Sequence, residues 1–425
     1  MPVTIVVGTQ WGDEAKGKIS DILAKDADIV ARFNGGDNAG HTVINQYGTF
    51  KQRLIPSGIF NEKVTSVIGP GVVLNLNTIT GELQDLSSRG IEIKDRLWIS
   101  PRCQIVLPYH KLIEELTEKA KGDLKTGTTK RGMSPVYADK VSYNGIRLFD
   151  LMTREKALKK ITTQLAIKNP TLEAFGFEPL KAEDILEEIL EKFELIRNVV
   201  REPFELMHTA LIGKANVLVE GAQSTLLDNT WGTYPYCTSS TTVTGGITAG
   251  LGIAPKWVSR VIGVAKAYMG RVGNGPFPTE LLDETGDHIR EEGQEYGTVT
   301  KRPRRCGWFD AELVRFSSML NGVSEIALTK LDVLDKLPEI KFSTHYETGE
   351  NNQTLRYWEG DADALFECEP IYETMDGWME STTKTREYSA LPENAQDYIE
   401  RLEKLLGYRI SMVSVGPSRE EIITR

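Results

Sequence analysis

The start of the chain constrains the fold more than any other segment. Residues 3–7 (VTIVV) form a continuous apolar run, which is typical of a strand buried on both faces of a parallel sheet. A glycine-rich turn follows directly, then a helical stretch at 19–24 and a second strand-like run at 28–33. This order predicts a β–α–β unit, the repeating element of α/β folds. Similar short runs lie at 65–68, 97–99, 217–219, 261–264 and 326–328, so we expect one long, mostly parallel central sheet.

Helices are expected between and beside these strands. The clearest lies at 182–200, where apolar residues recur every fourth position, and further amphipathic segments lie at 110–121 and 394–405. The polar, turn-rich segment 344–354 is expected to form a surface hairpin. Together with the sheet, these segments predict an α/β fold with helical insertions.

Composition and repeats bear on the number of domains. Hydrophobic residues make up 40% and charged residues 26% of the 425 residues, which allows a substantial core. The chain has no internal repeat, low-complexity tract or Pro/Ser-rich linker. We therefore expect a single domain over residues 1–425, with a helical insertion at about 105–210.

Charge and targeting features argue against several classes of protein. The net charge of −10 argues against a bulk nucleic-acid binder. No membrane span or secretory signal is expected, which favours a cytoplasmic protein. The four cysteines form no C-x-x-C pair, which indicates free thiols. An anionic ligand must then meet a local basic cluster.

A phosphate-binding loop is expected at residues 12–18 (GDEAKGK), which match G-x-x-x-x-G-K between a predicted strand and a predicted helix. In that context, backbone N–H groups and a helix N-terminus can surround phosphates. The Ser or Thr that would hold Mg²⁺ is replaced by Ile19, and Asp13 is the alternative metal ligand. A glycine-rich turn with solvated charges remains the other interpretation.

Residues 329–332 (TKLD) suggest how a base could be recognised, because they follow the apolar run at 326–328. The stem of Lys330 can lie along a base, and the Asp332 carboxylate can accept both the N1–H and the 2-amino group of guanine. Adenine offers no such pair of donors. The tetrapeptide therefore favours GTP over ATP, with a surface salt bridge as the alternative.

Three further polar segments carry candidate chemistry. Residues 34–42 (NGGDNAGHT) place His41 in a glycine-rich turn after a strand. Residues 300–305 (TKRPRR) form a basic cluster suited to carboxylate or phosphate, or else a solvated loop. The polar turns at 221–225 and 232–240 are weak indications by themselves.

Taken together, these segments closely resemble the adenylosuccinate synthetase family over the whole chain. The matching strings occur in family order: GTQWGDEAKGK, GGDNAGHT, IPSG, GTTKRGMSP, EGAQSTLLD, GTYPYCTSS, RVGNGPFPTE, RPRRCGWFD, TKLDVLD and SVGPSRE. The resemblance implies a GTP-dependent ligase of purine biosynthesis, a homodimer with one Mg²⁺ per subunit. The family transfers the γ-phosphoryl group of GTP to O6 of IMP, and the amine of L-aspartate then displaces phosphate from C6.

The resemblance also implies site residues. Asp13 matches the family's general base, His41 its acid or electrostatic helper, and Gln223 joins them in the catalytic set; Asp13 and Gly40 would hold Mg²⁺. GTP would be bound by Gly12, Asp13, Glu14, Ala15, Lys16, Gly17, Lys18, Gly40, His41, Thr42, Arg304, Lys330, Leu331, Asp332, Ser414, Val415 and Gly416. IMP would be bound by Asp13, Lys16, Asn38, Ala39, Thr129, Tyr143, Gln223, Thr238 and Arg302. L-Aspartate would be bound by Thr298, Val299, Thr300, Lys301, Arg302 and Arg304.

Some positions depart from the family pattern. Ala15 replaces a glycine of the phosphate loop, a change expected to have little effect if φ is negative there. Tyr143 replaces an arginine that reaches the IMP phosphate across the dimer interface, which predicts weaker IMP binding. Val299 and Lys301 depart from the family pattern in the loop that would bind L-aspartate, and Ser134 replaces a glycine.

These departures leave two alternatives to a ligase for IMP and L-aspartate. One is a paralogue with the same chemistry on another purine nucleotide or amino acid. The other, of a different class, is a guanine-nucleotide switch, which would leave Gln223, His41 and the Arg-rich loop without a role. A phage-type relative acting on dGMP is less favoured, because Asp13 is intact.

Overall fold

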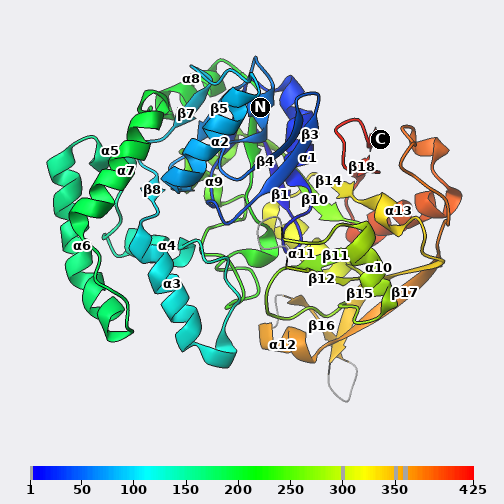
Figure 1. Cartoon of the computed structure of the whole chain (residues 1–425). Helices are drawn as coiled ribbons and strands as arrows, with labels where there is room; N and C mark the ends of the chain where they lie inside the picture. Colours follow the sequence, from blue (N-terminus) through cyan, green and yellow to red (C-terminus); the bar gives the residue numbers. More distant parts are fainter. Residues whose placement is uncertain (1–2, 298–301, 349–352, 358–361) are drawn as a thin grey trace.

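A nine-stranded sheet forms the centre of the molecule, with the order β19-β18-β14-β10-β1-β9-β2-β5-β7 (Figure 1). The computed structural model describes residues 3–297, 302–348, 353–357 and 362–425. All neighbouring strands run parallel except β18 and β19. The strands are β1 (Val3–Gly8), β2 (Ile29–Arg32), β5 (Thr65–Ile68), β7 (Leu97–Ile99), β9 (Val217–Glu220), β10 (Val258–Lys266), β14 (Glu325–Thr329), β18 (Ile410–Ser414) and β19 (Ile422–Thr424). The α/β class and the mostly parallel sheet predicted from the apolar runs are confirmed.

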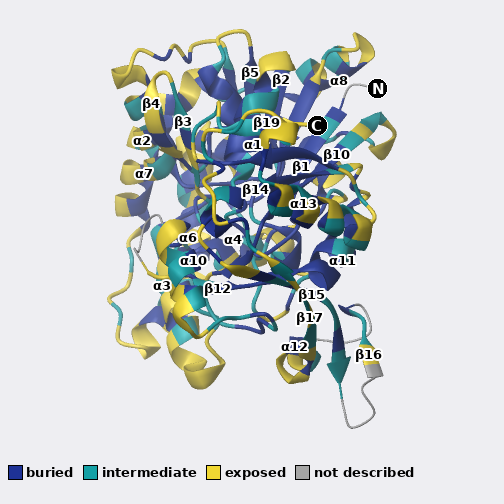
Figure 2. Ribbon diagram, turned by 90° about the vertical axis from the view of Figure 1, so that its right-hand side faces the viewer, coloured by how far each residue is buried: buried dark blue, intermediate teal, exposed yellow. Residues whose placement is uncertain are grey.

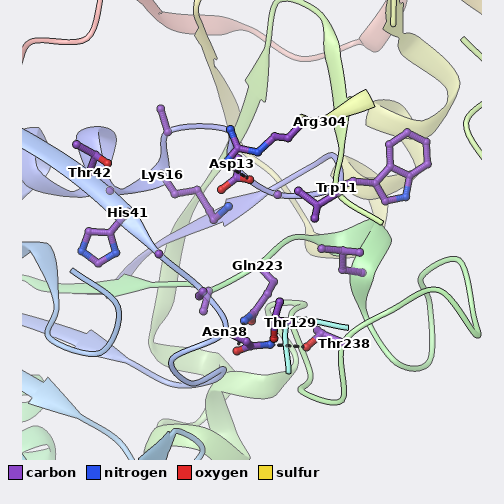
Figure 3. A pocket seen from close by; sticks show the side chains of 18 of the residues that line it. Trp11, Asp13, Lys16, Asn38, His41, Thr42, Thr129, Gln223, Thr238 and Arg304 are labelled. Atoms are coloured by element: carbon purple, nitrogen blue, oxygen red, sulfur yellow. Dashed lines mark hydrogen bonds and ion pairs between the residues drawn. The ribbon is translucent and has the colours of Figure 1, made fainter. Parts of the chain in front are cut away.

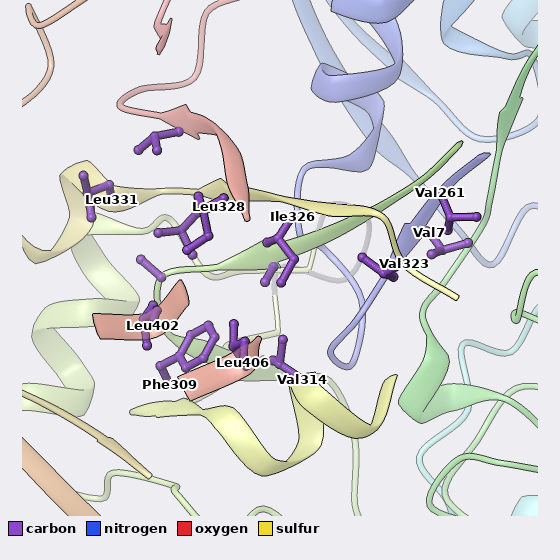
Figure 4. Close-up of a cluster of buried hydrophobic side chains, with 14 of the residues drawn as sticks. Val7, Val261, Phe309, Val314, Val323, Ile326, Leu328, Leu331, Leu402 and Leu406 are labelled. Carbon is purple, nitrogen blue, oxygen red and sulfur yellow. The ribbon is translucent and has the colours of Figure 1, made fainter. Parts of the chain in front are cut away.

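The central strand β1 is buried on both faces, as its apolar run predicts. Val3, Ile5 and Val7 belong to the largest apolar cluster, whereas Val6 packs on the other face with Ile19 of α1 (Lys16–Leu23). Helices α11 (Ala311–Asn321) and α13 (Glu393–Leu406) cover the first face, and their side chains meet those of β14 (Figure 4). Burial is therefore deepest where the strands cross the middle of the molecule (Figure 2).

The middle of the chain adds a mainly helical layer beside β5 and β7. The helices are α2 (Leu76–Ser88), α3 (Pro108–Ala120), α4 (Met133–Val141), α5 (Leu148–Leu151), α6 (Arg154–Ala174), α7 (Ala182–Ile196) and α8 (Phe204–Ile212). Ile185, Ile189 and Phe193 of α7 share one apolar cluster with Leu86 of α2 and with strand residues of the sheet edge. In Figure 1 these light-blue, cyan and green helices lie on the left, and α10 (Glu284–Glu292), α12 (Ala362–Glu367) and α13 lie on the right.

Three two-stranded sheets and one four-stranded sheet among the described residues complete the fold, together with α9 (Gly246–Leu251). They are β3 (His41–Asn45) with β4 (Gly48–Gln52), β6 (Val73–Leu74) with β8 (Gln104–Ile105), β11 (Met269–Arg271) with β12 (Arg305–Gly307), and β13 (Phe309–Asp310), β15 (Glu339–Thr348), β16 (Gln353–Leu355) and β17 (Glu369–Asp376). The hairpin expected at 344–354 is present as antiparallel pairing of β15 and β16, and its connection at 349–352 lies outside the described residues. Within the described ranges, no helix combines the length and apolar character needed to cross a bilayer.

Candidate active site

A cavity of about 560 Å³ opens where the loops at the carboxyl ends of β1, β9, β14 and β18 meet, the usual position of ligand sites in parallel α/β sheets. Side chains from these loops point toward one another in Figure 3. The cavity is lined by most of the residues expected from the sequence: Gly12, Asp13, Ala15, Lys16, Gly17, Lys18, Asn38, Ala39, Gly40, His41, Thr42, Thr129, Gln223, Thr238, Arg304, Lys330, Asp332, Ser414 and Gly416. The structure therefore brings the separate sequence motifs into one volume.

Five expected positions do not line the cavity in the described chain: Glu14, Tyr143, Arg302, Leu331 and Val415. Glu14, Leu331 and Val415 are fully buried and belong to the packing behind the loops. Tyr143 is 97% exposed beyond the end of α4. The remaining aspartate-site positions, Thr298, Val299, Thr300 and Lys301, lie outside the described residues.

The phosphate loop adopts a left-handed backbone at two positions that are not glycine. Asp13 has φ 60°, and Ala15 has φ 63° at the N-cap of α1. The expectation of a negative φ at Ala15 is therefore wrong. The loop turns around the Glu14 carboxylate, which points inward and accepts hydrogen bonds from the backbone N–H groups of Gln10 and Gly12. That inward turn requires the left-handed conformation on both sides of Glu14.

The Glu14 carboxylate also pairs with Lys16, whose Nζ lies 2.5 Å away. Burial alone would raise the pKa of Glu14, but Lys16 and the hydroxyl of Ser224 outweigh burial and lower it. The loop therefore carries an internal negative charge under its backbone. Incoming phosphates would face the N–H groups and the Lys16 ammonium rather than this carboxylate.

Lys18 joins the two ends of the chain. Its Nζ donates to the Ser414 hydroxyl at 2.7 Å and to the carbonyl oxygens of Gly416 at 2.7 Å and Glu421 at 2.8 Å. Burial lowers the pKa of Lys18 to about 8. The lysine of the G-K pair is thus committed to the C-terminal turn, and Lys16 is the ammonium group that the same loop leaves beside the cavity.

Arg304 connects Asp13 to a buried cluster around Glu295. One guanidinium nitrogen lies 2.7 Å from Asp13 Oδ2, and another lies 2.8 Å from Glu295 Oε2. Glu295 Oε1 also contacts Lys330 Nζ at 2.7 Å, Lys266 Nζ at 3.2 Å and the Tyr268 hydroxyl at 2.6 Å. Burial would raise the pKa of Glu295, but the three cations hold it well below its usual range. One carboxylate therefore fixes two cavity-lining cations, Arg304 and Lys330.

Asp332 presents the carboxylate expected for guanine. It lines the cavity, and its Oδ1 is buried without a hydrogen bond from any group in the described chain. Burial raises its pKa to about 6. Because an unsatisfied buried acceptor is costly, this oxygen is suited to a ligand that brings donors.

His41 lies against Glu220. The distance from Nδ1 to Glu220 Oε1 is 3.6 Å, while Nε2 is buried and has no partner among the described residues. Burial lowers the pKa of His41 to about 4, so the imidazole is neutral near pH 7. Glu220 also accepts a hydrogen bond from the Ser57 backbone N–H at 3.0 Å, which fixes its second oxygen. The ring is therefore held with one nitrogen available to a ligand.

Three of the residues expected for IMP, Asn38, Gln223 and Thr238, form a hydrogen-bonded group (Figure 3). Gln223, with φ 56°, donates from Nε2 to Asn38 Oδ1 at 2.9 Å, and Asn38 donates to the Thr238 hydroxyl at 3.3 Å. The Ser240 hydroxyl donates to Gln223 Oε1 at 3.3 Å. Thr129 lines the cavity beside this group.

Sequence reasoning missed three side chains that organise the site: Glu220, Glu295 and Lys266. Glu220 directly follows the predicted apolar run at 217–219 and is the last residue of β9, and the other two stand in segments without a motif. The apolar context of Lys266 at the end of β10 is the one local indication that a buried charge partner exists.

Asp13 and the backbone of Gly40 line the same cavity. They suit Mg²⁺, which takes oxygen ligands and is commonly bound through one carboxylate plus substrate phosphates. No cluster of three or more His, Cys, Asp or Glu side chains arranged for a metal occurs among the residues that the structure describes.

Comparison with known proteins agrees with this geometry. A family model described as adenylosuccinate synthetase matches residues 5–423. The adenylosuccinate synthetase of Ligilactobacillus salivarius is 47% identical over 422 residues, covering 99% of this chain and 97% of the relative. That of Dehalococcoides mccartyi is 47% identical over 424 residues, covering 100% of each chain.

Solved structures show the same likeness. A fully ligated adenylosuccinate synthetase from Plasmodium falciparum has a TM-score of 0.94, with 37% identity and 100% of both chains covered. The succinoaminodeoxyadenylate synthetase of cyanophage S-2L, bound to dGMP and dATP, shares the fold at a TM-score of 0.61 and 20% identity, over 100% of this chain and 95% of the other. On its sequence and its structure, the chain belongs to the adenylosuccinate synthetase family.

Proposed function

We propose that the chain is a GTP-dependent ligase that joins IMP and L-aspartate to give adenylosuccinate, GDP and phosphate. The observation that carries this proposal is the convergence in one cavity of the phosphate loop, the guanine-type pair Lys330 and Asp332, and the polar group around Gln223. Family membership makes the alternatives of a paralogue with other substrates and of a guanine-nucleotide switch unfavoured.

In the first step, Asp13 takes the proton from N1 of IMP while O6 attacks the γ-phosphorus of GTP and GDP leaves. Asp13 is placed for this role because its carboxylate lies at the cavity wall, and the contact with Arg304 holds it there. His41 supports the transferring phosphoryl group through its unpartnered Nε2. Asp332 and Lys330 hold the guanine base, and Lys16 faces the phosphates.

In the second step, the amine of L-aspartate attacks C6 and phosphate leaves with O6. The C6–N bond forms as the C6–O6 bond breaks, the proton that the amine loses leaves with phosphate, and N1 stays unprotonated in the product. Gln223 and Asn38 orient the purine during this exchange through their mutual hydrogen bond. Arg302 and the positions 298–301 are assigned to the aspartate carboxylates, on the basis of the sequence motif.

Mg²⁺, when bound, would neutralise charge on the β- and γ-phosphates of GTP. Asp13 and the carbonyl oxygen of Gly40 are the groups proposed to hold it. The enzyme is further proposed to act as a homodimer, in the cytoplasm as for the family in general. The exposed pair Val141 (72%) and Tyr143 (97%) at the end of α4 suits a contact with a second subunit.

The test measures GTP turnover by the purified protein with and without IMP plus L-aspartate, together with mass spectrometry of the products. A ligase should hydrolyse little GTP until both substrates are present, and should then form adenylosuccinate in proportion to GDP. GTP hydrolysis that ignores both substrates would support the switch. Product formation from another nucleotide or amino acid alone would support the paralogue.

A further inference from the structure

Of the three carboxylates of helix α3, Glu114 and Glu118 lie one helical turn apart on the same side of the helix. Both face the loop that leads from α3 to α4, whose residues Thr126, Gly127, Thr128 and Thr129 line the cavity. Glu118 itself is not among the lining residues. Its contacts therefore act on the loop and not on a ligand.

The Glu118 carboxylate accepts four hydrogen bonds from three consecutive residues. Oε1 receives the Thr126 hydroxyl at 2.8 Å and the Thr126 backbone N–H at 3.3 Å, and Oε2 receives the N–H groups of Gly127 at 2.8 Å and Thr128 at 3.3 Å. Successive N–H groups that converge in this way form a concave anion site. Here the anion is supplied by the protein's own helix.

Glycine is required at the centre of this arrangement. Gly127 has φ 79°, the left-handed conformation that lets neighbouring N–H groups point to one side. A Cβ at this position would lie 3.5 Å from the Cα of Gly273, an ordinary van der Waals contact, so the backbone conformation is what favours glycine. Asn274, next to that glycine, donates to the Lys125 carbonyl oxygen at 2.9 Å, so the loop is held from both sides.

The far end of the loop is held by the second carboxylate. Glu114 Oε2 accepts the backbone N–H of Gly132, the N-cap of α4, at 2.7 Å. The segment that contains Thr129 is thus held at both ends by carboxylates of the same helix, α3. Thr129 is exposed to the cavity and has no other anchor of this kind in the described chain.

We propose that Glu118 is a positioning residue for IMP: its carboxylate shapes the 126–128 turn and so places the Thr128 and Thr129 groups at the nucleotide monophosphate. The inference rests on the proposed function for the identity of the ligand. Removing the carboxylate should weaken IMP binding selectively, because Glu118 contacts none of the residues assigned to GTP.

Glu118→Gln is the test variant, because the amide keeps the shape but turns an N–H₂ donor toward the N–H groups of the loop. Glu115→Gln is the matched control, since Glu115 is an exposed residue of the same type on the same helix. Thr126→Val provides a second variant from the loop side, which removes the hydroxyl contact to the same carboxylate. Thermal denaturation of each variant establishes that it is folded.

Glu118→Gln should raise the Kd and KM for IMP by ~10-fold, the scale of a lost charge-assisted hydrogen bond, and leave those for GDP and GTP within ~2-fold of wild type. Thr126→Val should shift IMP in the same direction by less, and Glu115→Gln should match wild type. Equal losses for IMP and GTP, an unchanged IMP affinity, or the same loss in Glu115→Gln would overturn the proposal.

Amide hydrogen exchange of residues 126–128 without any ligand separates this inference from the proposed function. Exchange should be faster in Glu118→Gln than in wild type and in Glu115→Gln. If wild type uses no IMP, the proposed function fails, while faster exchange still establishes the anchor. Unchanged exchange in Glu118→Gln overturns the anchor itself.

Discussion

Replacing Ala15 by glycine tests the backbone conformation of the phosphate loop. Ala15 has φ 63° and ψ 32° at the N-cap of α1. An L-residue in this region costs roughly 1–2 kcal/mol, because its Cβ approaches the following carbonyl oxygen. Glycine removes that cost, but its greater conformational freedom in the unfolded chain lowers the stability by about 0.5–1 kcal/mol. The difference predicts that Ala15→Gly raises the free energy of unfolding by about 0.5–1 kcal/mol.

Equilibrium urea denaturation measures this difference against a matched control. Ala138 is a solvent-exposed residue within the right-handed helix α4. Ala138→Gly makes the same chemical change, but here glycine should lower the free energy of unfolding by about 1 kcal/mol. The two variants should move the denaturation midpoint in opposite directions with equal slopes. A midpoint for Ala15→Gly that is unchanged or lower than that of wild type would refute the reasoning.

Further outcomes are expected for the residues assigned to catalysis and to nucleotide binding. Asp13→Asn should lower kcat by at least ~10²-fold, the scale of a lost general base. His41→Asn should lower kcat far more than it raises KM. Initial rates check both variants, and near-normal turnover would remove that residue from the mechanism. Asp332→Asn should weaken GTP and favour XTP, because an amide can donate to the xanthine 2-carbonyl; equal use of ATP and GTP by wild type would contradict the assignment. Burial raises the pKa of Asp332 to about 6, so the ionised acceptor is lost as pH falls through that value. The KM of the wild type for GTP should therefore rise below about pH 6. The KM of the asparagine variant for XTP should not rise in the same range. Tyr143→Arg should lower the KM for IMP roughly ten-fold and leave that for GTP unchanged, because a charge-assisted hydrogen bond replaces a neutral one; no change would mean that the IMP phosphate is held elsewhere.

The sheet could be predicted from the sequence because strands that are buried on both faces are continuous apolar runs in the sequence. The runs at 65–68 and 97–99 coincide with β5 and β7, and the run at 3–7 with most of β1. The edge strands β18 and β19 were not expected. The motif loops were located for a similar reason, since glycine and polar residues directly follow each apolar run.

The parts that escaped prediction depend on contacts between distant residues. The left-handed φ of Ala15 follows from the inward turn of Glu14, which no local pattern records. Glu295 stands in an unremarkable polar segment, and its importance comes from cations that β10 and β14 bring to it. The G-K motif alone would direct Lys18 to the phosphates. In the structure its direction is set instead by hydrogen bonds to Ser414 and Gly416, which are far away in the sequence.

The contact of Lys18 with the C-terminal turn has a consequence for protein synthesis. β1 and the phosphate loop are translated before β9 and β10, although β1 lies between these two strands in the sheet. The turn at 414–416 that receives Lys18, and Arg419 that pairs with Asp21, are translated later still. A nascent chain should therefore have no guanine-nucleotide site until residues 414–419 have emerged. Truncation before these residues should give a product without nucleotide binding, instead of a fragment that hydrolyses GTP unproductively.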